Sequence, residues 1–343
     1  MNYFREQIED EVHSMICGYD LDADRDTEEE VKAVISVFPE VLSRRNDDGY
    51  YPMEVLLGKH YKINLKAISF LPLLAKLGIE HGQFQEEQRG GLIVQNEEEE
   101  EELGDQSVLK ILAGGSFCDH KNDVEYLQLV DARVVGVLRQ LRTMNLLRKK
   151  DIYEHNLLWE LSNGMYFPEK RFRFLVDLDP TFVVHSTTFG RVPLHRAAYR
   201  SSIQQFQLVF EAGIRYYPKH IGIRLLFYKD RNAGTPFQIA CKEHGKEEVM
   251  KVIESTLRRY WDCHYDTAHP LILAAIDRKI DLDCVYFLLR REPDVLQKLL
   301  SSAGSPCNDC NGNGNGDGNG IDNNDEKESS TTTTANPRKR KQK

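Results

Sequence analysis

The sequence lacks several features that would place it in a class at once. No apolar run approaches the roughly 20 residues that a helix needs to cross a bilayer, so no membrane association is expected. Residues 1–10 carry three acidic side chains and no apolar core, so we expect no secretory signal there. Basic charge is not in excess either, since 54 acidic residues outnumber 45 basic ones, for a net charge of −9. Direct nucleic-acid binding by the body of the chain is therefore not expected, because phosphate attraction needs a basic face.

Cysteine is sparse and scattered. Seven cysteines, an odd number, are spread widely along the chain, which indicates a reduced, intracellular protein, nuclear or cytoplasmic. Cys307 and Cys310 have C-x-x-C spacing, but they begin an Asn/Gly-rich run and are interpreted as exposed tail thiols. Residues 262–269 gather His, Cys and Asp without the second ligand pair of a tetrahedral site. No metal and no cofactor is expected.

Strand-like alternation is also rare, whereas helical periodicity recurs. Apolar residues fall at helical spacing, close to i, i+3, i+4 and i+7, in four segments that begin at Val31, Val134, Val249 and Leu282. Thr27 and Glu30 have the spacing of a capping box ahead of the first of these segments. The sequence therefore predicts an all-α fold.

Two segments share a turn-and-helix pattern. Residues 190–198 read Gly-Arg-Val-Pro-Leu-His-Arg-Ala-Ala, and residues 234–241 read Gly-Thr-Pro-Phe-Gln-Ile-Ala-Cys. Both resemble the T-P-L-H-x-A signature of an ankyrin repeat. A weaker copy spans residues 46–57, where Gly49 is expected to be left-handed and Pro52 to begin a helix. Further turns are expected near residues 151–161 and 269–275, so the array is irregular.

The chain is similar to the ankyrin-like proteins of diatom genomes, well over the stretch from about residue 151 to 300 and only loosely over its N-terminal half. The similarity is carried by the segments at residues 166–176, 206–218, 247–254 and 286–294, within a stretch from about 151 to 300. It implies an irregular ankyrin-type α-solenoid of stacked helix pairs with a disordered C-terminal tail. It transfers no defined activity.

The turns depart from the ankyrin pattern, in which a Thr hydroxyl and a His ring bond to each other and to the backbone. Val192 replaces the Thr although His195 is kept, and Gln238 replaces the His although Thr235 is kept. Each turn must therefore satisfy its backbone groups in another way. His195 is expected to brace its turn rather than to act as a general base, since no nucleophile or paired carboxylate is implied beside it.

Composition divides the chain into four regions. Residues 1–81 are expected to form degenerate ankyrin-like helix pairs, and residues 82–105 an acidic, flexible loop with six consecutive glutamates at 97–102. Residues 106–300 form the predicted repeat array. Residues 301–343 form a disordered tail rich in Asn, Gly and Thr, with a basic end.

The resemblance also implies a partner surface, because ankyrin repeats expose the residues that flank the turn glycine and those that follow the paired alanines. The implied contact residues are Thr188, Phe189, Arg191, Tyr199 and Arg200, then Arg231, Asn232 and Lys242 in the next repeat, and Tyr50 in the first. Interfaces favour aromatic and arginine side chains as anchors. The alternative is that Phe189 and Tyr199 merely pack against neighbouring turns.

The chain ends in a basic cluster of Arg338, Lys339, Arg340, Lys341 and Lys343. This cluster is a candidate nuclear-localisation signal for an import receptor, or else a solubilising end that binds polyanions without specificity. Together these features predict a non-enzymatic protein–protein interaction scaffold with a protein partner of unknown identity. The alternative is a structural or regulatory repeat protein without a dedicated partner.

Overall fold

The computed structural model describes residues 2–17, 21–57, 65–94, 107–114, 123–161, 166–199, 202–217, 220–260 and 285–286. The chain divides into two units, Met1–Leu300 and Ser301–Lys343, and all described residues belong to the first. Several expectations lie outside the described residues. They concern Arg200, the glutamates at 97–102, residues 262–269, the turn at 269–275, Cys307, Cys310 and the basic cluster at 338–343.

The described residues form helices and no β-strand, which confirms the all-α prediction. The α-helices are α1 (Asn2–Cys17), α2 (Glu28–Val37), α3 (Pro52–Leu56), α4 (Leu71–Glu80), α5 (Val108–Gly114), α6 (Val124–Thr143), α7 (Lys149–Glu154), α8 (Leu157–Leu161), α9 (Glu169–Leu178), α10 (Pro193–Tyr199), α11 (Ile203–Tyr216), α12 (His220–Arg224), α13 (Pro236–His244) and α14 (Lys246–Tyr260). Short 3₁₀ helices include η1 (Pro39–Leu42), η2 (Ala67–Phe70), η3 (Arg89–Gly91) and η6 (Pro180–Val184). Within the described ranges, no helix combines the length and apolarity that crossing a bilayer requires.

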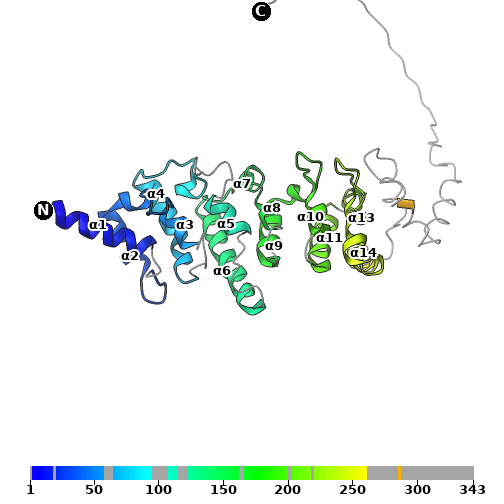
Figure 1. Cartoon of the computed structure of the whole chain (residues 1–343), viewed down its shortest axis with the longest axis horizontal. Coiled ribbons are helices and arrows are strands. Elements are labelled where there is room, and N and C mark those ends of the chain that lie inside the picture. The colour runs from blue at the N-terminus through cyan, green and yellow to red at the C-terminus, as the bar shows by residue number, and fades with distance from the viewer. Residues whose placement is uncertain are drawn as a thin grey trace, which may run out of the picture. The chain divides into compact units, whose positions relative to one another are not determined.

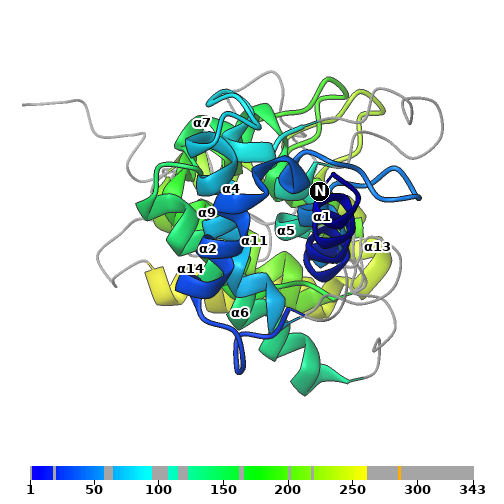
Figure 2. The same cartoon turned by 90° about the vertical axis from the view of Figure 1, so that its left-hand side faces the viewer.

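From α8 onward, short and long helices pack in successive layers. α10 pairs with α11 and α13 pairs with α14, while α10 packs on α13 and α11 packs on α14. One layer earlier, α8 pairs with α9 and also contacts α10. Figure 1 shows these pairs following one another in chain order, and Figure 2 views the same helices from the side of α1. The turns that precede α10 and α13 therefore belong to neighbouring layers.

Residues of the apolar stripes belong to the buried core. Val134, Val137, Leu138 and Leu141 of α6 are buried, as are Val249 and Ile253 of α14. The capping box is confirmed, because the Thr27 amide donates to Glu30 Oε2 at 3.0 Å and the Glu30 amide donates to Thr27 Oγ1 at 3.2 Å. The last stripe is described only at Val285, which is buried, and at Tyr286, which is exposed and so does not follow the stripe.

The turn and helix expected near residues 151–161 lie at residues 155–156 and at α8. Two residues separate α7 from α8, and the second of them, Asn156, has a positive φ of 51°. The sequence pattern did not show that α7 precedes this turn. The Arg148 amide donates to Asp151 Oδ2 at 2.7 Å, so Asp151 caps the start of α7.

Candidate functional site

Three turns, those before α3, α10 and α13, share one backbone design. Their first residues are Asn46, Thr187 and Asp230. In each turn the amide of the first residue donates to the carbonyl of the residue four positions later, at 2.9, 2.9 and 3.0 Å. The carbonyl of the first residue accepts from the residue three positions later, at 2.9, 2.8 and 3.0 Å. A proline then begins each helix, two residues after the turn closes. The shared design fixes where each turn tip points relative to its helix.

The fourth residue of each turn is left-handed. Gly49 and Gly190 take φ values of 84° and 73°, but the third turn places Ala233 there at φ 59°. In this turn the glycine falls one residue later, at Gly234, but counting back three residues from the proline, as in the other two turns, places Ala233 at the left-handed position. A side chain with a Cβ pays for this conformation, whereas glycine does not.

We therefore expect Ala233→Gly to stabilise the protein. Relief of the left-handed strain, less the added freedom of the unfolded chain, gives a gain of about 0.5–1 kcal/mol. Urea unfolding followed by circular dichroism measures it. Gly190→Ala is the matched reverse change, because an added Cβ there meets nothing nearer than 3.5 Å and introduces only the strain. A loss of stability in Ala233→Gly contradicts a strained left-handed conformation at residue 233.

The helix that follows each turn begins with the same capping bond, made by chemically different side chains. The amide just before the helix donates to the side chain of the third helical residue. The acceptors are Glu54 Oε2 from Tyr51 at 2.8 Å, His195 Nδ1 from Val192 at 3.1 Å and Gln238 Oε1 from Thr235 at 3.2 Å. Any acceptor of suitable length serves at this position. The turns that depart from the ankyrin motif are thus braced by substitutes.

Three bonds join the turn before α10 to the turn before α13. The Arg231 amide donates to the Phe189 carbonyl at 3.1 Å, and Arg191 Nε donates to Asp230 Oδ2 at 3.1 Å. The third bond runs from His195 Nε2 to the Gly234 carbonyl at 3.3 Å. The two tips are therefore one bonded surface rather than two independent loops.

Asp230 was not among the residues expected at the site, yet it organises this surface. Its Oδ1 accepts from the amides of Asn232 and Gly234 at 2.9 and 3.0 Å, while Oδ2 holds Arg191. Burial opposes ionisation of Asp230, but the bonds from Arg191, Gly234 and Asn232 outweigh it and lower its pKa. An Asp at the first position of a turn is the signal that could have found it.

The bonded tips display several of the expected contact residues. Phe189 is 63% exposed, and the Arg231 guanidinium carbon lies 5.7 Å from the centre of its ring. The side chain of Tyr199 at the end of α10 is 62% exposed. We call the expected contact residues of these two layers the turn surface, although two of them lie toward the ends of α10 and α13 and not on the tips: Thr188, Phe189, Arg191, Arg231 and Asn232 on the tips, and Tyr199 and Lys242 on the helices. Tyr50 is half-buried in the separate turn before α3, so the structure does not bring it into this surface.

His195 lies beneath the turn surface, and its hydrogen bonds select one neutral tautomer of the ring. It is buried, Nδ1 accepts from the Val192 amide, and Nε2 must therefore carry the proton that it donates to Gly234. Burial lowers the pKa of His195, and this outweighs the opposing effects of the Gly234 bond and the Asp230 charge. Both nitrogens serve the backbone, which leaves neither for proton transfer to a substrate.

The lowered pKa predicts a loss of stability in mild acid. The unfolded state gains a proton at His195 as the pH falls through about 6.5, while the folded state resists it until lower pH. The free energy of unfolding should therefore fall with a slope of up to about 1.4 kcal/mol per pH unit from this group. His195→Gln keeps an acceptor, as Gln238 shows in the next turn. Urea unfolding between pH 5 and pH 8 should give a shallower pH dependence for this variant, and equal slopes contradict the prediction.

Two other groups carry potential chemistry. Burial raises the pKa of the Cys17 thiol to about 12, so it is protonated at neutral pH and is a poor nucleophile. Asp151, Glu154 and His155 bring three potential metal ligands within 4.8 Å of one another. The Asp151 carboxylate is already held by Arg89 Nη2 at 3.2 Å and by the Arg148 amide, so it has a structural role.

Comparison with known proteins places the chain in no family. No family model matches it, and neither a curated protein nor a solved structure matches it. The resemblance to ankyrin repeats rests on the sequence motifs and stays a prediction.

Proposed function

We propose that this chain is a non-enzymatic protein-interaction scaffold that binds a protein partner through the turn surface. The first unit is proposed to be an irregular ankyrin-type stack of helix pairs. The repeated turn design, the proline that begins each helix and the pairwise packing from α8 to α14 support this assignment. The proposal includes no catalytic role for His195, because both of its ring nitrogens form hydrogen bonds with backbone groups.

The observation that carries the proposal is the exposed aromatic at a rigid turn tip. Phe189 is 63% exposed, although its own carbonyl and the neighbouring Arg231 are fixed by bonds between two layers. Large side chains on an ordered backbone lose little entropy on binding, and aromatic and arginine anchors dominate interface energies. The turn surface offers both within one bonded unit.

Affinity purification with crosslinking and mass spectrometry tests the proposal. The test variant is Phe189→Ala/Tyr199→Ala/Arg231→Ala. It leaves Arg191 in place, because Arg191 neutralises the buried Asp230. The matched control is Val124→Ala/Leu129→Ala/Arg133→Ala, which truncates two exposed apolar side chains and one exposed arginine on α6. A discrete partner should be depleted at least about tenfold from the test variant and retained by the control.

Two other outcomes decide between alternatives. Identical partner sets for both variants contradict binding through the turn surface and favour a repeat protein without a dedicated partner. Nuclear import receptors bound by the proposed basic signal at 338–343 should persist in both variants and disappear when those residues are removed. Persistence after that removal overturns the import-signal part of the proposal.

A further inference from the structure

The turn surface carries its aromatic and its cationic side chains in two neighbouring layers. Phe189 and Tyr199 belong to the layer of α10 and are 63% and 62% exposed. Arg231 and Lys242 belong to the layer of α13 and are exposed as well. Because α10 packs on α13, an aromatic row and a cationic row run side by side across this surface.

The two rows meet in pairs at both ends of the surface. At the tips, the Arg231 guanidinium carbon lies 5.7 Å from the centre of the Phe189 ring. At the other end, Tyr199 is the seventh residue of α10 and Lys242 is the seventh residue of α13, so they hold equivalent positions on helices that pack together. Each exposed aromatic therefore has a cation beside it in the next layer.

These two cations have no counter-charge among the residues that the structure describes. Neither the Arg231 side chain nor Lys242 forms an ion pair or donates a hydrogen bond there. A guanidinium over an aromatic ring still has its N–H groups to donate. Arg191 differs, because it pairs with Asp230, which is only 4% exposed. Arg231 and Lys242 are thus the cations of the surface that a partner can neutralise.

The whole surface is basic on an acidic protein. The turns and short helices of the two layers, residues 185–199 and 228–244, contain five basic and two acidic residues, a net charge of +3. The helices α7 and α8 of the preceding layer contribute −1 in total, which leaves +2. The chain as a whole carries −9. An anionic segment is therefore attracted to this surface and repelled by most of the molecule.

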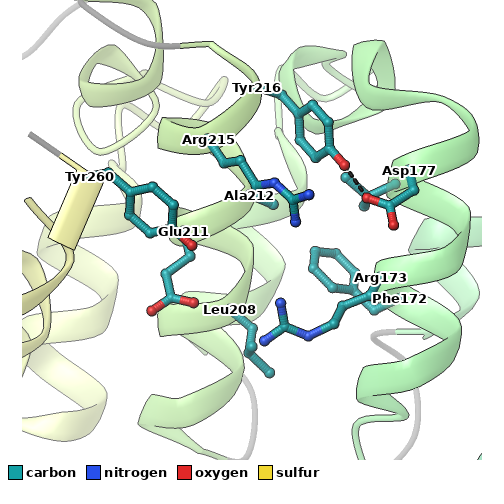
Figure 3. Close-up of a pocket in the computed structure, with 10 residues that line it drawn as sticks. Phe172, Arg173, Asp177, Leu208, Glu211, Ala212, Arg215, Tyr216 and Tyr260 are labelled. Atoms are coloured by element: carbon teal, nitrogen blue, oxygen red, sulfur yellow. Dashed lines mark hydrogen bonds between the residues drawn. The ribbon is translucent and has the colours of Figure 1, made fainter.

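The space between the long helices α9 and α11 shows no such excess of positive charge. Figure 3 shows that two arginines and two carboxylates line it: Arg173, Arg215, Asp177 and Glu211. The cavity there has a volume of about 20 Å³, enough for about one water molecule. Charge and space both distinguish the turn surface from this face of the long helices.

We infer that the turn surface binds an acidic segment of its partner, with apolar side chains on Phe189 and Tyr199 and carboxylates at Arg231 and Lys242. The inference rests on the proposed function and adds the chemical class of the partner. Arginine binds a carboxylate through two parallel bonds. An apolar side chain gains stability when it is buried against an aromatic ring. The two rows therefore select a segment in which apolar and acidic residues lie close together.

A random peptide display library, panned against the whole protein, tests this inference. The test variant is Arg231→Met/Lys242→Met, which removes both cations and keeps long apolar side chains. The matched control is Lys251→Met/Arg258→Met, at exposed positions of α14 outside the turn surface. Peptides recovered by the wild-type protein should be rich in Asp and Glu next to Leu, Ile or Phe. By fluorescence polarisation they should bind the control normally and the test variant at least about tenfold more weakly.

Replacing Glu by Gln in the recovered peptides locates the carboxylates. This change should weaken binding to the wild-type protein but have little further effect on Arg231→Met/Lys242→Met, because the same charge pair is already lost. Equal weakening for both proteins overturns the inference.

A second variant, Phe189→Ala/Tyr199→Ala, separates this inference from the proposed function. Peptides that need the two aromatics but are basic or uncharged, or that bind Arg231→Met/Lys242→Met as well as the control, overturn the acidic segment and leave the proposed function standing. If no recovered peptide is weakened by Phe189→Ala/Tyr199→Ala, the inference and binding through the turn surface are both contradicted.

Discussion

Asp131→Ala should lower the free energy of unfolding by about 3–5 kcal/mol, the range expected when one partner of a buried ion pair is removed. Asp131 of α6 and Arg171 of α9 are each only 2% exposed, and Arg171 Nε donates to Asp131 Oδ1 at 3.0 Å. The Asp131 carboxylate also accepts from the amides of Lys170 and Arg171 at 2.8 and 3.1 Å. It therefore caps α9 from a neighbouring helix.

Arg171 extends the same connection to a third helix. Its Nη1 donates to the carbonyls of Leu112 and Ala113 near the end of α5, at 3.0 and 3.1 Å. Removing Asp131 leaves this guanidinium buried without a counter-charge, and that accounts for the size of the expected loss. The pair thus fixes α5, α6 and α9 relative to one another.

Urea unfolding measures this effect, with Glu169→Ala as the matched control. Glu169 and Arg173 form an exposed pair on α9, and its loss should cost no more than about 0.5 kcal/mol. Replacing both Asp131 and Arg171 by leucine should recover part of the loss, because no unpaired charge is then buried. If Asp131→Ala lowers the free energy of unfolding no more than Glu169→Ala does, Asp131 and Arg171 do not form a buried ion pair.

Gly90→Ala should destabilise the protein by about 3–5 kcal/mol, through left-handed strain combined with a steric clash. Gly90 of η3 has a φ of 67°, and a Cβ added there would lie 1.9 Å from the carbonyl oxygen of Ala75 in α4. A backbone atom inside a packed helix cannot move aside as a flexible side chain can. The position therefore demands glycine for two independent reasons.

Gly82→Ala separates these two reasons. Gly82 has a nearly identical φ of 69°, but an added Cβ meets nothing within 4 Å. Its replacement should cost only the strain, about 1–2 kcal/mol. Thermal unfolding followed by circular dichroism should give Gly90→Ala a much lower melting temperature than Gly82→Ala. Equal melting temperatures contradict the close contact between η3 and α4.

Local features were predictable from the sequence because they depend on neighbouring residues. Periodicity gave the apolar faces of α6 and α14, and the spacing of Thr27 and Glu30 gave a capping box. Pro52 begins α3 and Gly49 is left-handed, as the turn chemistry requires. Each of these depends on interactions within a few residues.

The remaining features depend on partners far apart in the sequence. Asp131 and Arg171 are 40 residues apart, and Arg191 and Asp230 are 39 apart. Neither pairing is encoded in a local pattern; each follows from which helices pack together. Ala233 is left-handed although Gly234 follows it, because the backbone bonds of the turn and not the place of the glycine fix the conformation of the fourth residue.

Site-specific photo-crosslinking tests the central proposal most directly. Phe189 is replaced by p-benzoylphenylalanine, which keeps an exposed aromatic ring at the turn tip, and Leu129 of α6 receives the same amino acid as the control. Irradiation in the cell should join position 189 to a discrete protein partner, while position 129 should give no such adduct. A partner surface at the turns is contradicted if position 189 yields no adduct, or only the adducts that position 129 also yields.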